Sequence, residues 1–146
     1  EVLPKHIGHE QRSARLLEKV CNRLRVPNDC RELADVVARE HGNVHRAGEI
    51  GAGALVRLLE RCDAFRKPER FDEVLLACEC DARGRLGLEE RAYPQRERLR
   101  AALTAARTVS TAAVAADAAA RGLKGEQVGA EIHRARIEAV AQRLAE

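Results

Sequence analysis

Residues 10–26, EQRSARLLEKVCNRLRV, decide the fold class of this chain. The large apolar residues of this stretch fall on one face of a 3.6-residue helix: Leu16, Leu17, Val20 and Leu24. Its basic residues fall on a neighbouring stripe: Arg12, Arg15, Lys19 and Arg23. The sequence then turns at Pro27, and we expect Asn28 to cap a second helix.

The same helical spacing recurs along the rest of the chain. We expect the second helix to run to about residue 41, where Gly42 ends it, and residues 43–50 to form a loop or single turn. Further helices are expected over 51–64, from Pro68, from Pro94 to about 107, in the alanine-rich stretch that follows, and from about 126. No segment alternates with a period of two. The sequence therefore predicts an all-α fold, a compact bundle of about six to seven helices with no sheet.

Composition supports closely packed helices. Of the 146 residues 45% are hydrophobic, but only Phe65, Phe71 and Tyr93 are aromatic, so the core must consist mainly of Leu, Val and Ala. No stretch approaches the roughly 20 apolar residues of a membrane span. The five cysteines form no C-x-x-C pair, and we expect reduced, partly buried thiols rather than a cysteine zinc site. The chain contains no methionine, and we expect it to be a piece of a longer protein.

Two short windows contain most of the histidines. Residues 6–10 (HIGHE) and 41–45 (HGNVH) suggest a histidine-based metal or phosphate site, because imidazoles bind transition metals well and carboxylates can orient them. The windows can meet only if the first two helices pair antiparallel, which their short connection favours. Spacing alone leaves open the alternative that these residues simply face water. His133 lies on an amphipathic helix without partners in the sequence, and we expect it to be structural or exposed.

Arginine is more frequent than lysine, and it concentrates in two helical stripes. The net charge is only +3, so the placement of the basic residues says more about possible partners than their total does. The stripes comprise Arg12, Arg15 and Lys19 in the first helix, and Arg96, Arg100 and Arg107 in the fifth. Such stripes can follow a nucleic-acid backbone, whereas the scarcity of aromatic residues argues against recognition of unstacked bases. The alternative is ordinary solvated helix faces with paired charges.

Several stretches together resemble a known family. The pattern H-x-x-H-E-x-x-S at 6–13 resembles the middle histidine motif of the HD-type phosphohydrolase domain. Residues 57–68 (RLLERCDAFRKP), 77–85 (ACECDARGR) and 93–95 (YPQ) resemble that domain as it occurs in bacterial multifunctional CCA-adding tRNA nucleotidyltransferases. Residues 122–125 (GLKG) and 136–140 (RIEAV) resemble that family's closing segment. The resemblance spans nearly the whole chain.

The resemblance implies a cytoplasmic enzyme that restores the 3′-terminal CCA of tRNA from CTP and ATP with Mg²⁺. It also implies a metal-dependent phosphohydrolase site, with Ni, Mn or Mg, that acts on phosphate esters and 2′,3′-cyclic nucleotides. By motif, His9 would be the middle metal ligand, His41 a further histidine and Asp63 the closing aspartate. Glu10 and Ser13 would be local supports, whereas His6 and His45 match the pattern less well. No membrane partner is implied.

The chain departs from the family pattern in one important respect. It has no His-Asp dipeptide and none of the glycine and carboxylate motifs of the nucleotidyltransferase head domain. We therefore expect the C-terminal portion of such an enzyme. Residues 1–83 would be the rear part of an HD domain, and residues 84–146 a helical segment packed on it as one structural unit. Alone it would be inactive, with an empty partial metal site. The alternative is a non-catalytic helical module that binds RNA or protein.

Overall fold

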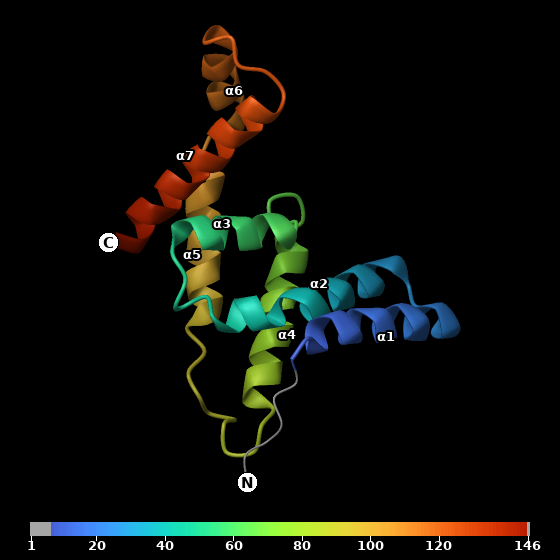
Figure 1. Cartoon of the computed structure of the whole chain (residues 1–146). Helices are drawn as coiled ribbons and strands as arrows, with labels where there is room; N and C mark the ends of the chain where they lie inside the picture. The colour runs from blue at the N-terminus through green and yellow to red at the C-terminus, as the bar shows by residue number, and fades with distance from the viewer. Residues whose placement is uncertain (1–6, 146) are drawn as a thin grey trace.

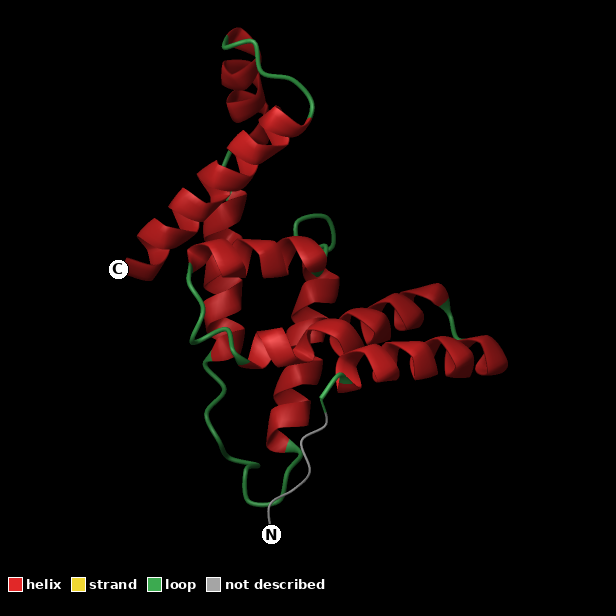
Figure 2. Cartoon of the chain, viewed as in Figure 1, coloured by secondary structure: helices red, strands yellow, loops and turns green. Residues whose placement is uncertain are grey.

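A computed structural model describes residues 7–145, which contain seven helices and no strand (Figures 1 and 2). The helices are α1 (His9–Leu24), α2 (Asn28–His45), α3 (Ala52–Arg61), α4 (Pro68–Arg83), α5 (Gln95–Arg107), α6 (Thr111–Ala120) and α7 (Glu126–Ala145). The prediction of an all-α fold is confirmed. Within this range no helix has the length and apolar content needed to cross a membrane.

The helices form a central group from which two hairpins project in different directions. Helices α3, α4 and α5 lie at the centre, and α1 and α2 run side by side away from them (Figure 1). The second hairpin, α6 and α7, extends from another side, and α7 also packs against α3 and α5. Helix α2 contacts both α3 and α4, and so joins the first hairpin to the centre.

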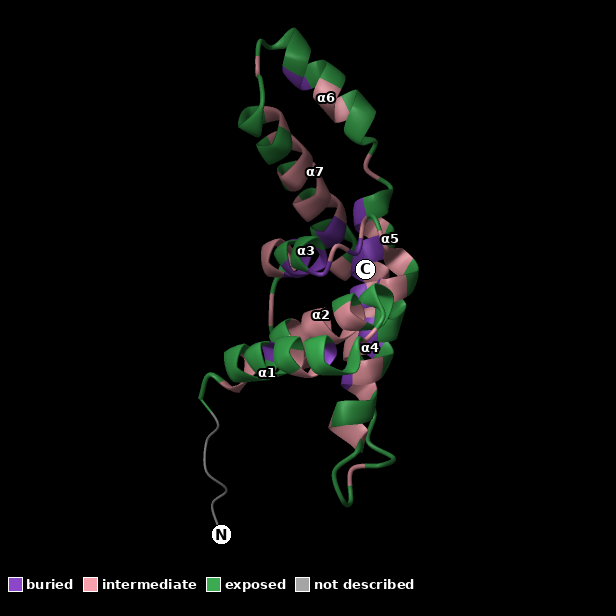
Figure 3. Cartoon of the chain, turned by 90° about the vertical axis from the view of Figure 1, so that its right-hand side faces the viewer, coloured by how far each residue is buried: buried purple, intermediate pink, exposed green. Residues whose placement is uncertain are grey.

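The hydrophobic core lies where the central helices meet α2 and α7 (Figure 3). Its largest fully buried side chains come from five helices: Val44, Leu55, Leu58, Leu59, Phe71, Leu75, Leu99 and Val140. Burying each of these side chains contributes about 1.5–3 kcal/mol to the free energy of unfolding. As the composition predicts, the core is mostly Leu, Val and Ala, with Phe71 as its one fully buried aromatic residue among 7–145.

The end of α2 differs from the sequence prediction. The helix continues through Gly42 and ends at His45, so residues 43–45 are helical rather than a loop. Gly42 does not have a positive φ angle. A Cβ atom at Gly42 would lie 3.2 Å from Oε1 of Glu10. This glycine therefore leaves space for the Glu10 carboxylate beside α2 instead of terminating the helix.

The helix boundaries near residues 28 and 62 also differ from prediction. Asn28 is the first residue of α2, and Pro27 occupies the cap position without a side-chain cap bond. Helix α3 ends at Arg61 rather than near residue 64, because Asp63 adopts a left-handed conformation with φ 54°. The N–H of Ala64 then donates to the carbonyl of Leu59 at 2.9 Å, which closes the helix in a Schellman-type turn.

The buried face of α1 is narrower than its apolar pattern suggests. Only Ala14 and Cys21 are buried, whereas Leu16 and Leu24 are each 62% exposed. The reason is that α1 packs mainly against one helix, α2, and a single neighbour covers only part of a helix surface. Within residues 7–145, the outer side of α1 is a mixed basic and apolar surface.

Candidate functional site: a row of histidines

The antiparallel pairing of α1 and α2 brings the start of one helix to the end of the other. His9 lies at the first position of α1 and His41 in the last part of α2. Their Nε2 atoms are 2.9 Å apart, and their ring centroids are 5.0 Å apart. The two histidine windows therefore meet, as antiparallel pairing of the first two helices predicts.

The contacts of His41 fix its tautomer. Its Nδ1 lies 3.0 Å from the carbonyl oxygen of Val37, which can only accept a hydrogen bond. Nδ1 of His41 therefore donates, and in the neutral ring Nε2 presents its lone pair to His9. This arrangement suits either a hydrogen bond from His9 or ligation of a cation between the two rings.

The two imidazoles fit part of a metal site. Nitrogen ligands about 2.0–2.1 Å from a tetrahedral zinc lie about 3.3 Å from each other, so the observed pair would need to open by only a few tenths of an ångström. However, no cluster of three or more His, Cys, Asp or Glu residues within 7–145 is placed to hold a metal ion. A catalytic zinc site uses about three protein ligands. The described residues therefore supply two nitrogen ligands, and a complete site needs at least one more.

Glu10 lies directly beside this histidine pair. A hydrogen bond from its own backbone N–H is the largest cause of the lowered pKa of its carboxyl group, and electrostatic interactions, including that with the Arg46 guanidinium, add to it. One oxygen, Oε2, is 3.5 Å from Nδ1 of His9. A hollow of about 770 Å³ opens in front of these residues. Ser13, one turn further along α1, is exposed.

His45 lies one helical turn beyond His41, with the two ring centroids 5.8 Å apart. Its Nε2 is 2.9 Å from Oδ2 of Asp81 on α4, and its Nδ1 is 2.8 Å from the hydroxyl of Tyr93. The ionised carboxylate of Asp81 can only accept, so Nε2 of His45 donates to it, and in the neutral ring Nδ1 accepts from the Tyr93 hydroxyl. Burial raises the pKa of Tyr93 above its ordinary value, which keeps the phenol protonated. Both ring nitrogens are thus engaged, and neither offers a free lone pair to a metal.

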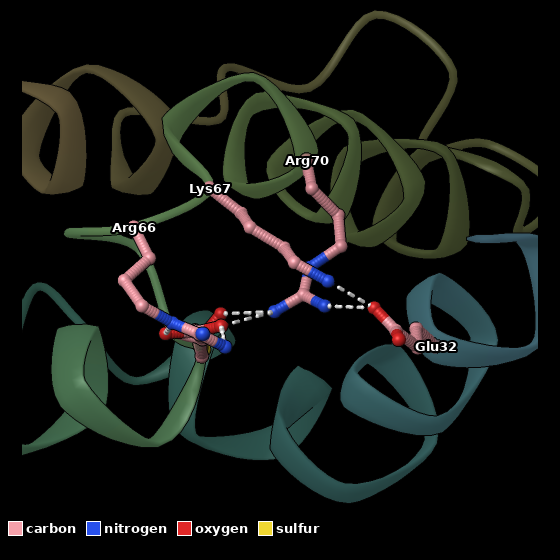
Figure 4. A network of polar contacts seen from close by, with 6 residues as sticks. Glu32, Arg66, Lys67 and Arg70 are labelled. Carbon is pink, nitrogen blue, oxygen red and sulfur yellow. Dashed lines mark hydrogen bonds and ion pairs between the residues drawn. The ribbon is translucent and has the colours of Figure 1, made fainter. Parts of the chain in front are cut away.

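Asp63 lies apart from the histidine row. It forms ion pairs with Arg66 at 2.6 Å and with Arg70 at 3.7 Å. The hydrogen bonds from Arg66 are the main cause of the lowered pKa of Asp63. Arg70 and Lys67 also contact Glu32, near the start of α2 (Figure 4). The structure therefore places Asp63 in a charged network that is connected through Arg70 to Glu32.

Two other histidines were singled out from the sequence. His6 lies outside the described residues. His133, expected to be structural or exposed and without partners in the sequence, does have a partner. Its Nδ1 lies 2.9 Å from Oε1 of Glu60, so it links α7 to α3.

The arginine stripe of α5 is largely occupied by internal ion pairs. Arg96 contacts Glu79 at 2.8 Å, and Arg100 contacts Asp72 at 2.7 Å and Glu97 at 3.2 Å. Arg107 is exposed at the end of α5 and makes no ion pair among residues 7–145. Two of the three cations are therefore already paired within the fold.

The basic stripe of α1 is less occupied by internal contacts. Arg12 donates to the carbonyl of Ile7 at 2.8 Å. Arg15 and Lys19 are exposed and form no ion pair with residues 7–145. The two stripes look alike in sequence. The structure shows that internal ion pairs neutralise most of the α5 stripe, whereas the α1 stripe is largely without them among residues 7–145.

Sequence reasoning did not find the partners of His45. Asp81 and Tyr93 are 36 and 48 positions away from it, and no local spacing connects residues at such separations. Both lie in stretches that carry the family resemblance, but a short motif does not say which side chains touch.

The chain is similar to proteins named "Multifunctional CCA protein" from several bacteria. It is 70% identical over 144 residues to those of Acidovorax sp. (strain JS42) and Acidovorax ebreus (strain TPSY), and 72% identical over 145 residues to that of Paracidovorax citrulli (strain AAC00-1). These alignments cover 99% of this chain but only 34–35% of each relative. The chain thus spans about a third of the length of these relatives. No family model matches the chain, and no solved structure matches it.

Proposed function

Because the chain is homologous over nearly its whole length to a portion of bacterial multifunctional CCA proteins, we propose that it is the C-terminal portion of such an enzyme. The parent enzyme restores the CCA end of tRNA in the cytoplasm from CTP and ATP, with catalytic carboxylates outside these 146 residues. This portion has two roles in the parent: it provides half of an HD-type metal site and it binds the tRNA backbone. Residues 1–83 carry the former role, and residues 84–146 pack on them.

The His9–His41 pair is the observation that supports the metal site. Two imidazole nitrogens 2.9 Å apart, one with its tautomer fixed by Val37, are suited to share one divalent ion. When bound, such an ion would polarise a phosphate oxygen and generate a hydroxide nucleophile near neutral pH. The remaining ligands come from a part of the parent outside residues 7–145. Asp63 would have to leave Arg66 and Arg70 before it could bind the same ion.

The metal site is tested in the full-length parent enzyme. We expect His41→Ala to reduce Ni²⁺- or Mn²⁺-stimulated hydrolysis of a 2′,3′-cyclic nucleotide by at least about 100-fold while CCA addition stays unchanged. His133→Ala, which removes an imidazole far along the chain on α7, is the matched control and should leave hydrolysis unchanged. Full hydrolysis by the His41→Ala enzyme would remove the proposed role of the histidine pair.

The unpaired cations support the tRNA-binding role. Arg15 and Lys19 on α1 and Arg107 on α5 have no acidic partner among residues 7–145, and are therefore available to phosphates. Arg12, Arg96 and Arg100 lie on the same stripes and extend them. Because an arginine held by a carboxylate must first lose that partner, we expect the unpaired residues to contribute more.

The tRNA-binding role is tested by comparing variants of the unpaired and the paired cations in the full-length parent enzyme. Replacing Arg15, Lys19 and Arg107 together by alanine should weaken tRNA binding and flatten its dependence on salt, since each phosphate contact adds about 0.9 to the slope. Replacing the paired residues Arg96 and Arg100 should have the smaller effect. Unchanged binding at low salt in the triple variant would exclude these cations from the interface.

A second candidate function is a non-catalytic helical module that binds RNA or protein. The outer side of α1, where Leu16 and Leu24 are exposed beside Arg15 and Lys19, favours it. The hydrolysis assay of the full-length protein separates the two functions. If the chain is a non-catalytic module, the unmodified full-length protein should show no metal-stimulated hydrolysis of a 2′,3′-cyclic nucleotide.

A further inference from the structure

We infer that Gln95 and Arg98, at the start of α5, are positioning residues for the His9–His41 pair. Their side chains bind backbone carbonyls at the end of α2 and in the loop that follows it, and together they form what we call the α5 clamp. The importance of the clamp for a metal ion rests on the metal site proposed above. Its effect on the geometry of the two histidines does not.

Three hydrogen bonds form the α5 clamp. Nε2 of Gln95 donates to the carbonyl of His45 at 3.0 Å. Nε of Arg98 donates to the carbonyl of Ala47 at 2.9 Å, and its Nη2 donates to that of Ile50 at 3.3 Å. All three bonds are partly buried and join residues 48–51 positions apart in the chain. The start of α5 is thereby fastened to the end of α2, beside which it lies (Figure 1).

The three carbonyls are at positions where a helix has stopped supplying donors. The last carbonyls of a helix have no N–H group one turn further on. The N–H of Ala47 still donates to the carbonyl of Val44 at 3.0 Å. The carbonyls of His45, Ala47 and Ile50 receive side-chain donors from α5 instead. Ala47 is fully buried, so its carbonyl would be costly to leave without the Arg98 donor.

Arg98 differs from its neighbours on the same helix. Arg96 bonds to the carboxylate of Glu79, and Arg100 bonds to that of Asp72. Arg98 instead bonds to two backbone carbonyls, and its planar group spans both of them. A side chain that bonds at two points of one short loop restricts the position of that loop. A lysine at this position would offer a single ammonium group and a weaker restraint.

The position of the end of α2 determines where the histidine rings lie. His41 and His45 are one helical turn apart on α2, and the clamp holds the carbonyl of His45. Nε2 of His41 meets Nε2 of His9 at 2.9 Å. A hydrogen bond weakens steeply when its distance or angle departs from the ideal, so a small shift or rotation of the last turn of α2 would separate the two rings. The clamp therefore holds His41 against His9.

The first test measures the histidine geometry without any metal, by nuclear magnetic resonance of the imidazole nitrogens of the 146-residue chain in EDTA. Arg98→Ala should move the Nε2 signal of His41 toward that of a free, unprotonated imidazole nitrogen, because the contact with His9 is lost. Arg98→Lys should move it less, because the ammonium group keeps one bond. Arg136→Ala is the matched control: it removes a partly buried arginine that lies over Phe65, and it should leave the signal unchanged.

The second test measures metal use in the full-length parent enzyme. Arg98→Ala and Gln95→Glu should each raise about tenfold the Mn²⁺ concentration that gives half-maximal hydrolysis of a 2′,3′-cyclic nucleotide. Gln95→Glu keeps the size of the side chain but places an acceptor against the carbonyl of His45. Saturating Mn²⁺ should restore the rate, and CCA addition should stay unchanged. Gln142→Glu makes the same change at an exposed position of α7 and should not alter the Mn²⁺ midpoint.

Three results would overturn the inference: an unchanged His41 signal in Arg98→Ala, an equal change in Arg136→Ala, or an unaltered Mn²⁺ midpoint in the clamp variants. A general loss of stability would lower hydrolysis and CCA addition together at the same midpoint. If Arg98→Ala does not fold, Arg98→Lys and Gln95→Glu provide both measurements. Absence of metal-stimulated hydrolysis in the unmodified parent would instead refute the proposed metal site, and the resonance measurement would still decide whether the clamp positions the histidines.

Discussion

Nε2 of His9 lies 2.9 Å from Nε2 of His41, although the two residues are 32 positions apart in the chain. The contact depends on how closely the start of α1 approaches the last turns of α2. Gly42 sits at this approach, where an added Cβ would lie 3.2 Å from Oε1 of Glu10. The geometry of the histidine pair is therefore coupled to the packing of the α1–α2 hairpin.

This coupling predicts the effect of enlarging Gly42. Gly42→Val should lower the free energy of unfolding by about 1 kcal/mol, because the branched side chain occupies the space that the Glu10 carboxylate now fills beside α2. Chemical denaturation measures the change. Gly129→Val is the matched control: Gly129 also lies within a helix but has no atom within 4 Å of an added Cβ. This control should be neutral or gain a few tenths of a kcal/mol from helix propensity; an equal loss in both variants would refute the packing explanation.

The hydrogen bond between Tyr93 and His45 should stabilise the fold. Tyr93→Phe keeps the ring but leaves Nδ1 of His45 without its donor at a partly buried position, and we expect it to cost about 1 kcal/mol. A double-mutant cycle with His45→Phe isolates the bond from other effects of each change. Additive losses, with no coupling between the two positions, would show that the bond adds nothing to stability.

The Glu32 network predicts how stability changes with pH. The hydrogen bond from Lys67, followed by the charges of Lys67 and Arg70, lowers the pKa of Glu32 below its ordinary value in the folded chain. Because the pKa of Glu32 is lower in the folded chain, its ionised form stabilises the fold at pH values above the unfolded-state pKa of a glutamate, about 4.3. This stabilisation is lost as the pH falls through the folded-state pKa of Glu32. The free energy of unfolding should therefore fall on acidification below about pH 5.

Glu32→Gln should make this fall shallower, because the replaced group cannot titrate. Glu138→Gln serves as the control, since Glu138 is exposed and has no ion pair among residues 7–145. Parallel pH profiles for Glu32→Gln and the unmodified chain would contradict the role of this network. Urea denaturation between pH 3 and pH 7 provides the measurement.

Burial predicts which thiols react. Cys62 and Cys78 are buried, and desolvation raises the pKa of each thiol to about 12, so almost no reactive thiolate forms near neutral pH. Cys30 and Cys80 are exposed. Iodoacetamide at pH 8 should therefore label Cys30 and Cys80 in the folded chain, and mass spectrometry of the peptides identifies the sites. Rapid labelling of Cys62 or Cys78 before unfolding would disagree with the structure, and labelling in denaturant gives the reference rate.

The sequence by itself determined the secondary structure, because helix formation depends on spacings of three and four residues that are visible locally. The positions of Pro27, Pro68 and Pro94 located three helix starts to within a residue. Local rules failed at Gly42, because a glycine that ends a helix and one that lies within a helix beside another side chain look the same in sequence. They failed again at Asp63, whose left-handed conformation shortens α3.

The site was determined only in part by the sequence. The two histidine windows and the short connection that favours an antiparallel hairpin were visible in the sequence, and so His9 and His41 could be named together. The structure alone decided that Asp81 and Tyr93 hold His45, that Asp63 joins Arg66 and Arg70, and which arginines stay unpaired. These contacts join residues tens of positions apart. They follow from the way whole helices pack, which depends on the total energy of many small apolar contacts. No short residue pattern predicts that total.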